Sequence, residues 1–181
     1  MEEFDVQFDA CAFDLKPGLP PEGMPREQVY AGRVYPDGYV DNLLQTARDA
    51  GIEMKRPSII PNTHRAHEAT EFARDANRLL EFHRAVFHAY WVEEQNIGDV
   101  DVLSSVAAGC GLDAEALRAA LADGRYAPRV EEQMAWTKAV GVTGVPTTIF
   151  DERFSVVGAQ EYELFRDVAT RVASGKLEAE G

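Results

Sequence analysis

Cysteine is scarce in this chain of 181 residues, which contains only Cys11 and Cys110, far apart in the sequence and without a Cys-x-x-Cys motif. Disulfide exchange needs a thiolate of lowered pKa and a second thiol close enough to resolve the mixed disulfide. We therefore predict no catalytic residue of that kind here. Cys110 lies between two glycines after an apolar run, and we expect it to be buried. Cys11 remains a possible reactive thiol, because its expected position in a strand leaves its orientation open.

Positive charge is also scarce, with 18 lysines and arginines against 31 aspartates and glutamates and a net charge of −13. Such a charge repels phosphate backbones and anionic lipid, so we expect neither nucleic acid nor membrane as a partner. The acidic start MEEFDVQFD lacks the basic residues and apolar core of a secretory signal. No run approaches a membrane-spanning length. We predict a cytoplasmic protein with reduced thiols.

One stretch of the sequence could be considered as a metal site. His64 and His67 are three residues apart, with Glu68 and Glu71 nearby, in the expected first turn of a long helix. Acidic residues in a first turn also complement the helix dipole, and no cysteine or second segment converges on this one. We predict no metal and no cofactor.

The segment 141–160, GVTGVPTTIFDERFSVVGAQ, carries the strongest local pattern. Pro146 precedes an expected strand at 147–150, the first strand position that a proline tolerates. A tight turn and a second strand at 154–157 follow, and then 161–173 has the apolar period of a one-sided helix. This order of elements predicts the C-terminal β-β-α half of a thioredoxin-like domain.

The rest of the chain predicts one further strand and several helices. Apolar and polar residues alternate from Phe4, which indicates a strand within 4–15, and the prolines and glycines of 16–36 indicate an irregular crossing. Apolar periodicity predicts helices at 40–47, at 62–90 with a break near Asn77, at 100–107, from Asp113 to Gly124, and at 128–140. We expect residues 1–60 and 141–181 to form a thioredoxin-like domain, with 61–140 as an inserted helical domain.

Several stretches together resemble the DsbA-like family, in particular its FrnE-like and 2-hydroxychromene-2-carboxylate isomerase-like branches. They are GVTGVP followed by GAQ, CAFDLKP at residues 11–17, Asn62-Thr63 with Ala66-His67, Asn96-Ile97-Gly98-Asp99, and Gly111-Leu112-Asp113. The resemblance runs from about residue 4 to about 173. It implies an α/β thioredoxin-like fold with an inserted helical domain. The strand and helix with which that family begins, at whose junction it carries Cys-x-x-Cys or a serine, are missing from this sequence.

The resemblance assigns substrate binding to Val145 and Pro146. A cis Val145–Pro146 bond, as in that family, would turn the Val145 N–H and C=O toward a cleft, where an extended peptide could pair with them. Alternatively, Pro146 only stiffens the entry to a strand. The partners implied are protein or peptide dithiols and disulfides for the oxidoreductase branch, and glutathione for the isomerase branch. The missing strand predicts a gap in the sheet, filled by residues 1–12 or by a second copy, and hence a possible homodimer.

Three functions remain open from the sequence. We favour a fragment or short form of a DsbA-like thiol–disulfide oxidoreductase, which alone should be inactive. The alternatives are a glutathione-dependent isomerase or transferase of the same fold, and a non-catalytic scaffold that binds a peptide or partner. The DNA upstream of Met1 would separate them, since an in-frame Cys-x-x-Cys segment selects the first, a serine in its place the second and a stop codon the third.

Overall fold

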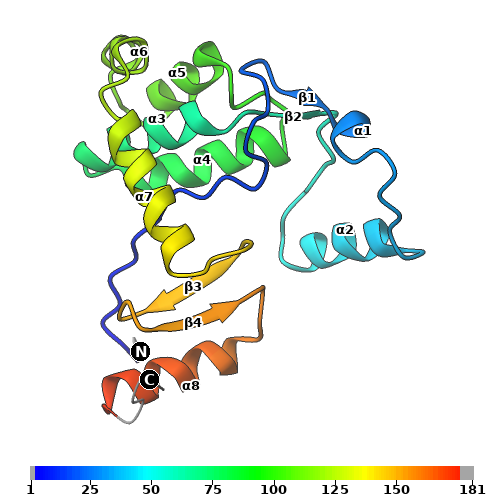
Figure 1. Cartoon of the computed structure of the whole chain (residues 1–181), viewed down its shortest axis with the longest axis vertical. Helices are drawn as coiled ribbons and strands as arrows, with labels where there is room; N and C mark the ends of the chain where they lie inside the picture. The colour runs from blue at the N-terminus through cyan, green and yellow to red at the C-terminus, as the bar shows by residue number, and fades with distance from the viewer. Residues whose placement is uncertain (1–2, 176–181) are drawn as a thin grey trace. The chain divides into compact units, whose positions relative to one another are not determined.

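The computed structural model describes residues 3–175 and divides into two compact units (Figure 1). Unit 1 combines Met1–Leu15 with Gln133–Gly181, and unit 2 is Lys16–Glu132. No helix within residues 3–175 is long and apolar enough to cross a membrane.

Unit 2 is built on a helical core. Phe82, Leu103 and Leu117 are completely buried where its helices meet. The helices are α3 (His64–Asp75), α4 (Leu79–Trp91), α5 (Val100–Gly109), α6 (Ala114–Asp123) and α7 (Ala127–Ala139), the last of which continues into unit 1.

The helix boundaries follow the local signals in the sequence. Asn77, between α3 and α4, has a φ of 56°, so the predicted break is confirmed. The Asp113 carboxylate accepts hydrogen bonds from the backbone N–H groups of Glu115 and Ala116, both at 3.0 Å, and thereby caps α6. Gly124 ends that helix with a φ of 65°, a left-handed conformation that favours glycine.

Residues 16–60 group with the helices of unit 2, whereas we expected them in the thioredoxin-like domain. They contain β1 (Met24–Pro25), α1 (Arg26–Val29), α2 (Tyr39–Asp49) and β2 (Ile59–Ile60), with β1 and β2 paired antiparallel. Two asparagine side chains bind this segment: Asn62 Nδ2 donates to Leu19 O at 2.7 Å, and Asn96 Nδ2 donates to Glu22 O at 3.2 Å. Gly23 is needed beside β2, because a Cβ on it would lie 2.7 Å from Ile60 O.

Unit 1 contains the hairpin and helix that the segment 141–160 predicts. Strands β3 (Thr147–Phe150) and β4 (Phe154–Val157) pair antiparallel, with Thr147 opposite Val157, and α8 spans Tyr162–Ala173. Helix α8 packs on the hairpin through Phe165, whose ring centroid lies 6.4 Å from that of Phe150.

The strand predicted within residues 4–15 does not form. The described residues of this segment include no strand, and β3 pairs with β4 alone. Alternation marks one face of a strand, but a strand also needs a neighbouring strand to pair with, and no strand of residues 3–175 pairs with this segment. Its Ala12 N–H donates to Gln133 Oε1 at 2.9 Å, while Val6 and Phe8 remain 71% and 57% exposed. Pairing with a second copy remains a prediction.

Candidate functional site

The proline loop of unit 1, residues 144–146, is held by two hydrogen bonds, one to the residue before Val145 and one to the residue after it. The Thr147 hydroxyl donates to Gly144 O at 2.8 Å, and Gly158 N–H donates to Pro146 O at 2.8 Å. The Val145–Pro146 peptide bond is cis. The loop is thereby fastened to the start of β3 and to the end of β4.

Val145 itself has open hydrogen-bonding capacity. Within residues 3–175, neither its N–H nor its C=O forms a hydrogen bond, and the residue is 52% exposed. Exposed backbone groups in this state bind water or a polypeptide partner. Val145 and Pro146, to which the resemblance assigns substrate binding, are both exposed.

The two cysteines differ in accessibility and form no disulfide. Cys11 is exposed, on the extended segment of unit 1. Cys110 follows α5 and is only 6% exposed, and burial raises the pKa of its thiol. A buried thiol of raised pKa is a poor nucleophile and cannot resolve a mixed disulfide on Cys11. The arrangement allows alkylation of Cys11 but provides no exchange cycle between the two.

The histidines and glutamates of α3 do not assemble a metal site. No group of three or more metal-ligating side chains converges in the described part of the chain. His64 Nε2 lies 3.7 Å from Glu68 Oε1, and burial raises the pKa of Glu68. Glu71 is buried and paired with Arg74 and Arg129. These glutamates therefore belong to the packing of unit 2.

A cluster of cations around one tyrosine ring in unit 2 was not predicted from the sequence. Lys16, Arg26 and Arg33 all lie over the ring of Tyr30. The local signal was the high density of tyrosine and arginine between residues 26 and 39. Arg26, Tyr30 and Arg33 have the i, i+4 and i+7 spacing of one helix face, which could have indicated their contact. Lys16, fourteen positions before Tyr30, has no such local signal.

Comparisons with known proteins agree with this geometry. Residues 2–169 match the family model of the DSBA-like thioredoxin domain. The protein YwbO of Bacillus subtilis (strain 168), whose name records no function, is 30% identical over 169 residues, which cover 89% of this chain and 80% of that protein.

Two solved structures have the same fold. A probable DsbA oxidoreductase from Streptomyces coelicolor superposes with a TM-score of 0.82 at 27% identity, covering 93% of this chain and 76% of that one. A 2-hydroxychromene-2-carboxylate isomerase superposes with a TM-score of 0.68 at 20% identity, covering 92% of this chain and 81% of that one, a likeness of fold alone. The predicted α/β thioredoxin-like fold is confirmed, and the chain belongs to the family of DSBA-like thioredoxin domains.

Proposed function

We propose that this chain is the polypeptide-binding part of a DsbA-like thiol–disulfide oxidoreductase, and that it binds an extended segment of a dithiol or disulfide substrate at Val145. The open N–H and C=O of Val145 carry this proposal. Main-chain pairing gives affinity with little side-chain preference, which suits an enzyme that acts on many proteins. The similarity to a probable DsbA oxidoreductase supports the redox branch over the isomerase branch.

A nuclear magnetic resonance titration tests the binding step. The probe is an extended peptide with a single S-methylated cysteine, and its matched control is the same peptide with alternate backbone nitrogens methylated. We expect the Val145 amide signal to shift with the first peptide and to stay in place with the second, which cannot donate the ladder hydrogen bonds. Equal shifts with both peptides, or none at Val145, would contradict the proposal.

An insulin-reduction assay tests the redox step separately. The sequence has no Cys-x-x-Cys and Cys110 is buried, so the chain alone and its Cys11→Ser variant should show the same background rate. Fusion of a family-like strand and helix with Cys-x-x-Cys should confer activity. If the unmodified chain clearly outperforms Cys11→Ser, then Cys11 is a working nucleophile. If glutathione rather than peptide shifts the Val145 amide, the isomerase or transferase branch is favoured.

A further inference from the structure

Helix α2 is an amphipathic helix of unit 2 whose apolar face has no partner. Its apolar residues have the i, i+3, i+4 and i+7 spacing of one helix face: Val40, Leu43, Leu44 and Ala47. None of them is buried, and Leu43 is 42% exposed. No other described helix or strand packs closely against α2, which lies apart from α3 to α6 in Figure 1. An isolated helix of 11 residues is marginally stable in water, so we expect another surface to cover this face.

Helix α4 has an apolar stripe on its outward side. Leu80 is 44% exposed, and Phe87, seven residues later on the same side, is 53% exposed. His83 lies between them, with its ring centroid 4.7 Å from that of Phe87, and burial lowers the pKa of His83, which keeps that ring uncharged at neutral pH. The opposite side of α4 packs Phe82 and Val86 into the core. The stripe of Leu80, His83 and Phe87 is therefore a second apolar face in the same unit.

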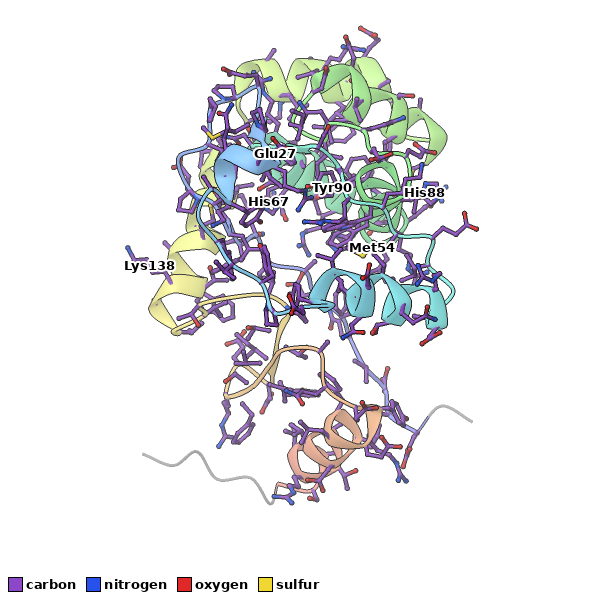
Figure 2. The ribbon with its side chains drawn as sticks, turned by 90° about the vertical axis from the view of Figure 1, so that its right-hand side faces the viewer. Glu27, Met54, His67, His88, Tyr90 and Lys138 are labelled. Carbon is purple, nitrogen blue, oxygen red and sulfur yellow. The ribbon has the colours of Figure 1, made fainter. Side chains whose placement is uncertain are left out.

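A short segment connects the end of α2 to the end of α4. The Lys55 N–H donates to Trp91 O, at the last residue of α4, at 2.7 Å. In Figure 2 the labelled Met54 lies between α2 and the labelled His88 of α4. Residues 50–54 allow a separation of at most roughly 20 Å between the end of α2 and this hydrogen bond. The apolar face of α2 is therefore held near α4 at an effective concentration on the order of millimolar.

We propose that α2 is a strap that docks along the stripe of α4, with the C-terminal ends of the two helices together. The 11 residues of α2 and the 13 residues of α4 give lengths of about 17 and 20 Å, so the two faces match in length. Leu43 would cover Phe87, and Val40 would lie toward Leu80. The tether favours α2 over a second copy of the chain, because a second copy at micromolar concentration is far more dilute.

Charge does not select or oppose this pairing. Beside its apolar face α2 carries Asp41 and Arg48, and beside the stripe α4 carries Glu81, Arg84 and His88. Each helix thus has acidic and basic residues next to its apolar face, so apolar contact determines the docking. Closure of the strap would exclude water and other polypeptides from the stripe, and opening would expose both faces at once. The strap does not depend on the function proposed for Val145.

Hydrogen exchange of the full chain, followed by nuclear magnetic resonance, tests the docking. We expect the amides of α2 to be protected in the unmodified chain, although the helix is short. Phe87→Ser on α4 should speed the exchange of these α2 amides by roughly tenfold, because it removes the apolar surface on which α2 docks. The matched control Phe87→Leu keeps an apolar side chain and should change the exchange by less than about twofold. The amides of α5 should exchange alike in all three proteins, which separates undocking from a loss of global stability.

A cross-linking experiment tests the register. Leu43→Cys with Phe87→Cys should be bridged within one chain by a short dimaleimide, in a background of Cys11→Ser and Cys110→Ala. Gln45→Cys with Phe87→Cys is the control, since Gln45 lies on the polar face of α2, and it should be bridged much more slowly. Circular dichroism checks that each variant remains folded.

Three results would overturn the proposal. The first is rapid exchange of the α2 amides in the unmodified chain, or α2 exchange that is the same in Phe87→Ser and the unmodified chain. The second is equal bridging of the Leu43 and Gln45 pairs. The third is protection of α2 that rises with protein concentration and disappears in Phe87→Ser, which would make a second copy of the chain the occupant of the stripe.

Discussion

Replacement of Arg129 by methionine should destabilise unit 2, because Arg129 on α7 links two carboxylates of α3. Its Nη1 donates to Asp75 Oδ1 at 2.8 Å and to Glu71 Oε2 at 3.3 Å. The Glu71 side chain is only 2% exposed, and Arg74 Nε also donates to it, at 3.0 Å. The substitution therefore leaves a buried carboxylate with one guanidinium partner where it had two.

The size of the loss follows from this remaining partner. Complete removal of the partner of a buried charge costs about 3–5 kcal/mol. Arg74 stays in place and the Arg129 side chain is 43% exposed, so we expect the free energy of unfolding to fall by about 1–2 kcal/mol. For a domain of this size, that lowers the melting temperature by about 3–8 °C.

Urea unfolding followed by circular dichroism measures the loss. Arg125→Met is the matched control, since Arg125 pairs with the exposed Asp123 two residues away and its removal should cost less than about 0.5 kcal/mol. A double-mutant cycle of Arg129→Met with Glu71→Gln should give a coupling of about 1 kcal/mol. Equal losses in the two arginine variants, or a coupling of zero, would refute the reasoning.

The pH dependence gives an independent check of the same contacts. The hydrogen bond from Arg129 lowers the pKa of Asp75. A carboxyl whose pKa is lower in the folded state stabilises the fold above its unfolded pKa of about 4, and that contribution disappears as the pH falls through the folded pKa. The difference in stability between the unmodified chain and Arg129→Met should therefore shrink below about pH 4.

Three further substitutions test the turn, a buried acid and the core. Glu152→Gly should stabilise unit 1 by about 1 kcal/mol in urea unfolding, because Glu152 has a φ of 55° in the hairpin turn; an equal gain for Glu152→Ala would contradict this. Glu68→Gln should raise the melting temperature at pH 7 and have little effect near pH 4. The reason is that burial raises the pKa of Glu68, so that its ionised form opposes folding at higher pH. Equal gains in melting temperature at both pH values would contradict this prediction. Leu103→Ala, in the core of unit 2, should lower the free energy of unfolding in urea by about 2–5 kcal/mol. The control Leu164→Ala, at an exposed position, should lower it by less than about 1 kcal/mol. Similar losses in the two variants would mean that Leu103 does not lie in a packed core.

The helices of unit 2 could be predicted because their boundaries depend on neighbouring residues. Asp113 caps α6 through N–H groups two and three positions ahead, Gly124 ends it through its own backbone, and Asn77 separates α3 from α4 by its positive φ. The hairpin of unit 1 could be predicted for the same reason, since its turn joins adjacent strands. The Val145 loop followed from the hairpin and from the resemblance.

The predictions that failed depended on contacts between distant parts of the chain. The alternation from Phe4 describes one face of a strand but not whether a neighbouring strand exists. The segment 16–60 is tied to unit 2 by the Asn62 and Asn96 side chains, 43 and 74 residues from their acceptors. The contact of Lys16 with the Tyr30 ring likewise joins residues fourteen positions apart. Local patterns do not contain these pairings.

The small core of unit 1 connects its fold to its proposed use. Among its described residues, only Ala12, Thr137 and Val156 are buried, whereas the core of unit 2 is extensive. A two-stranded hairpin alone is marginally stable in water, and more strands or a packed helix are needed to stabilise it. Helix α8 supplies part of that packing, yet β3 has no neighbour other than β4 within residues 3–175. Each main-chain hydrogen bond that a bound strand forms with Val145, as proposed above, would therefore also stabilise unit 1, because a ligand that binds only the folded state stabilises that state.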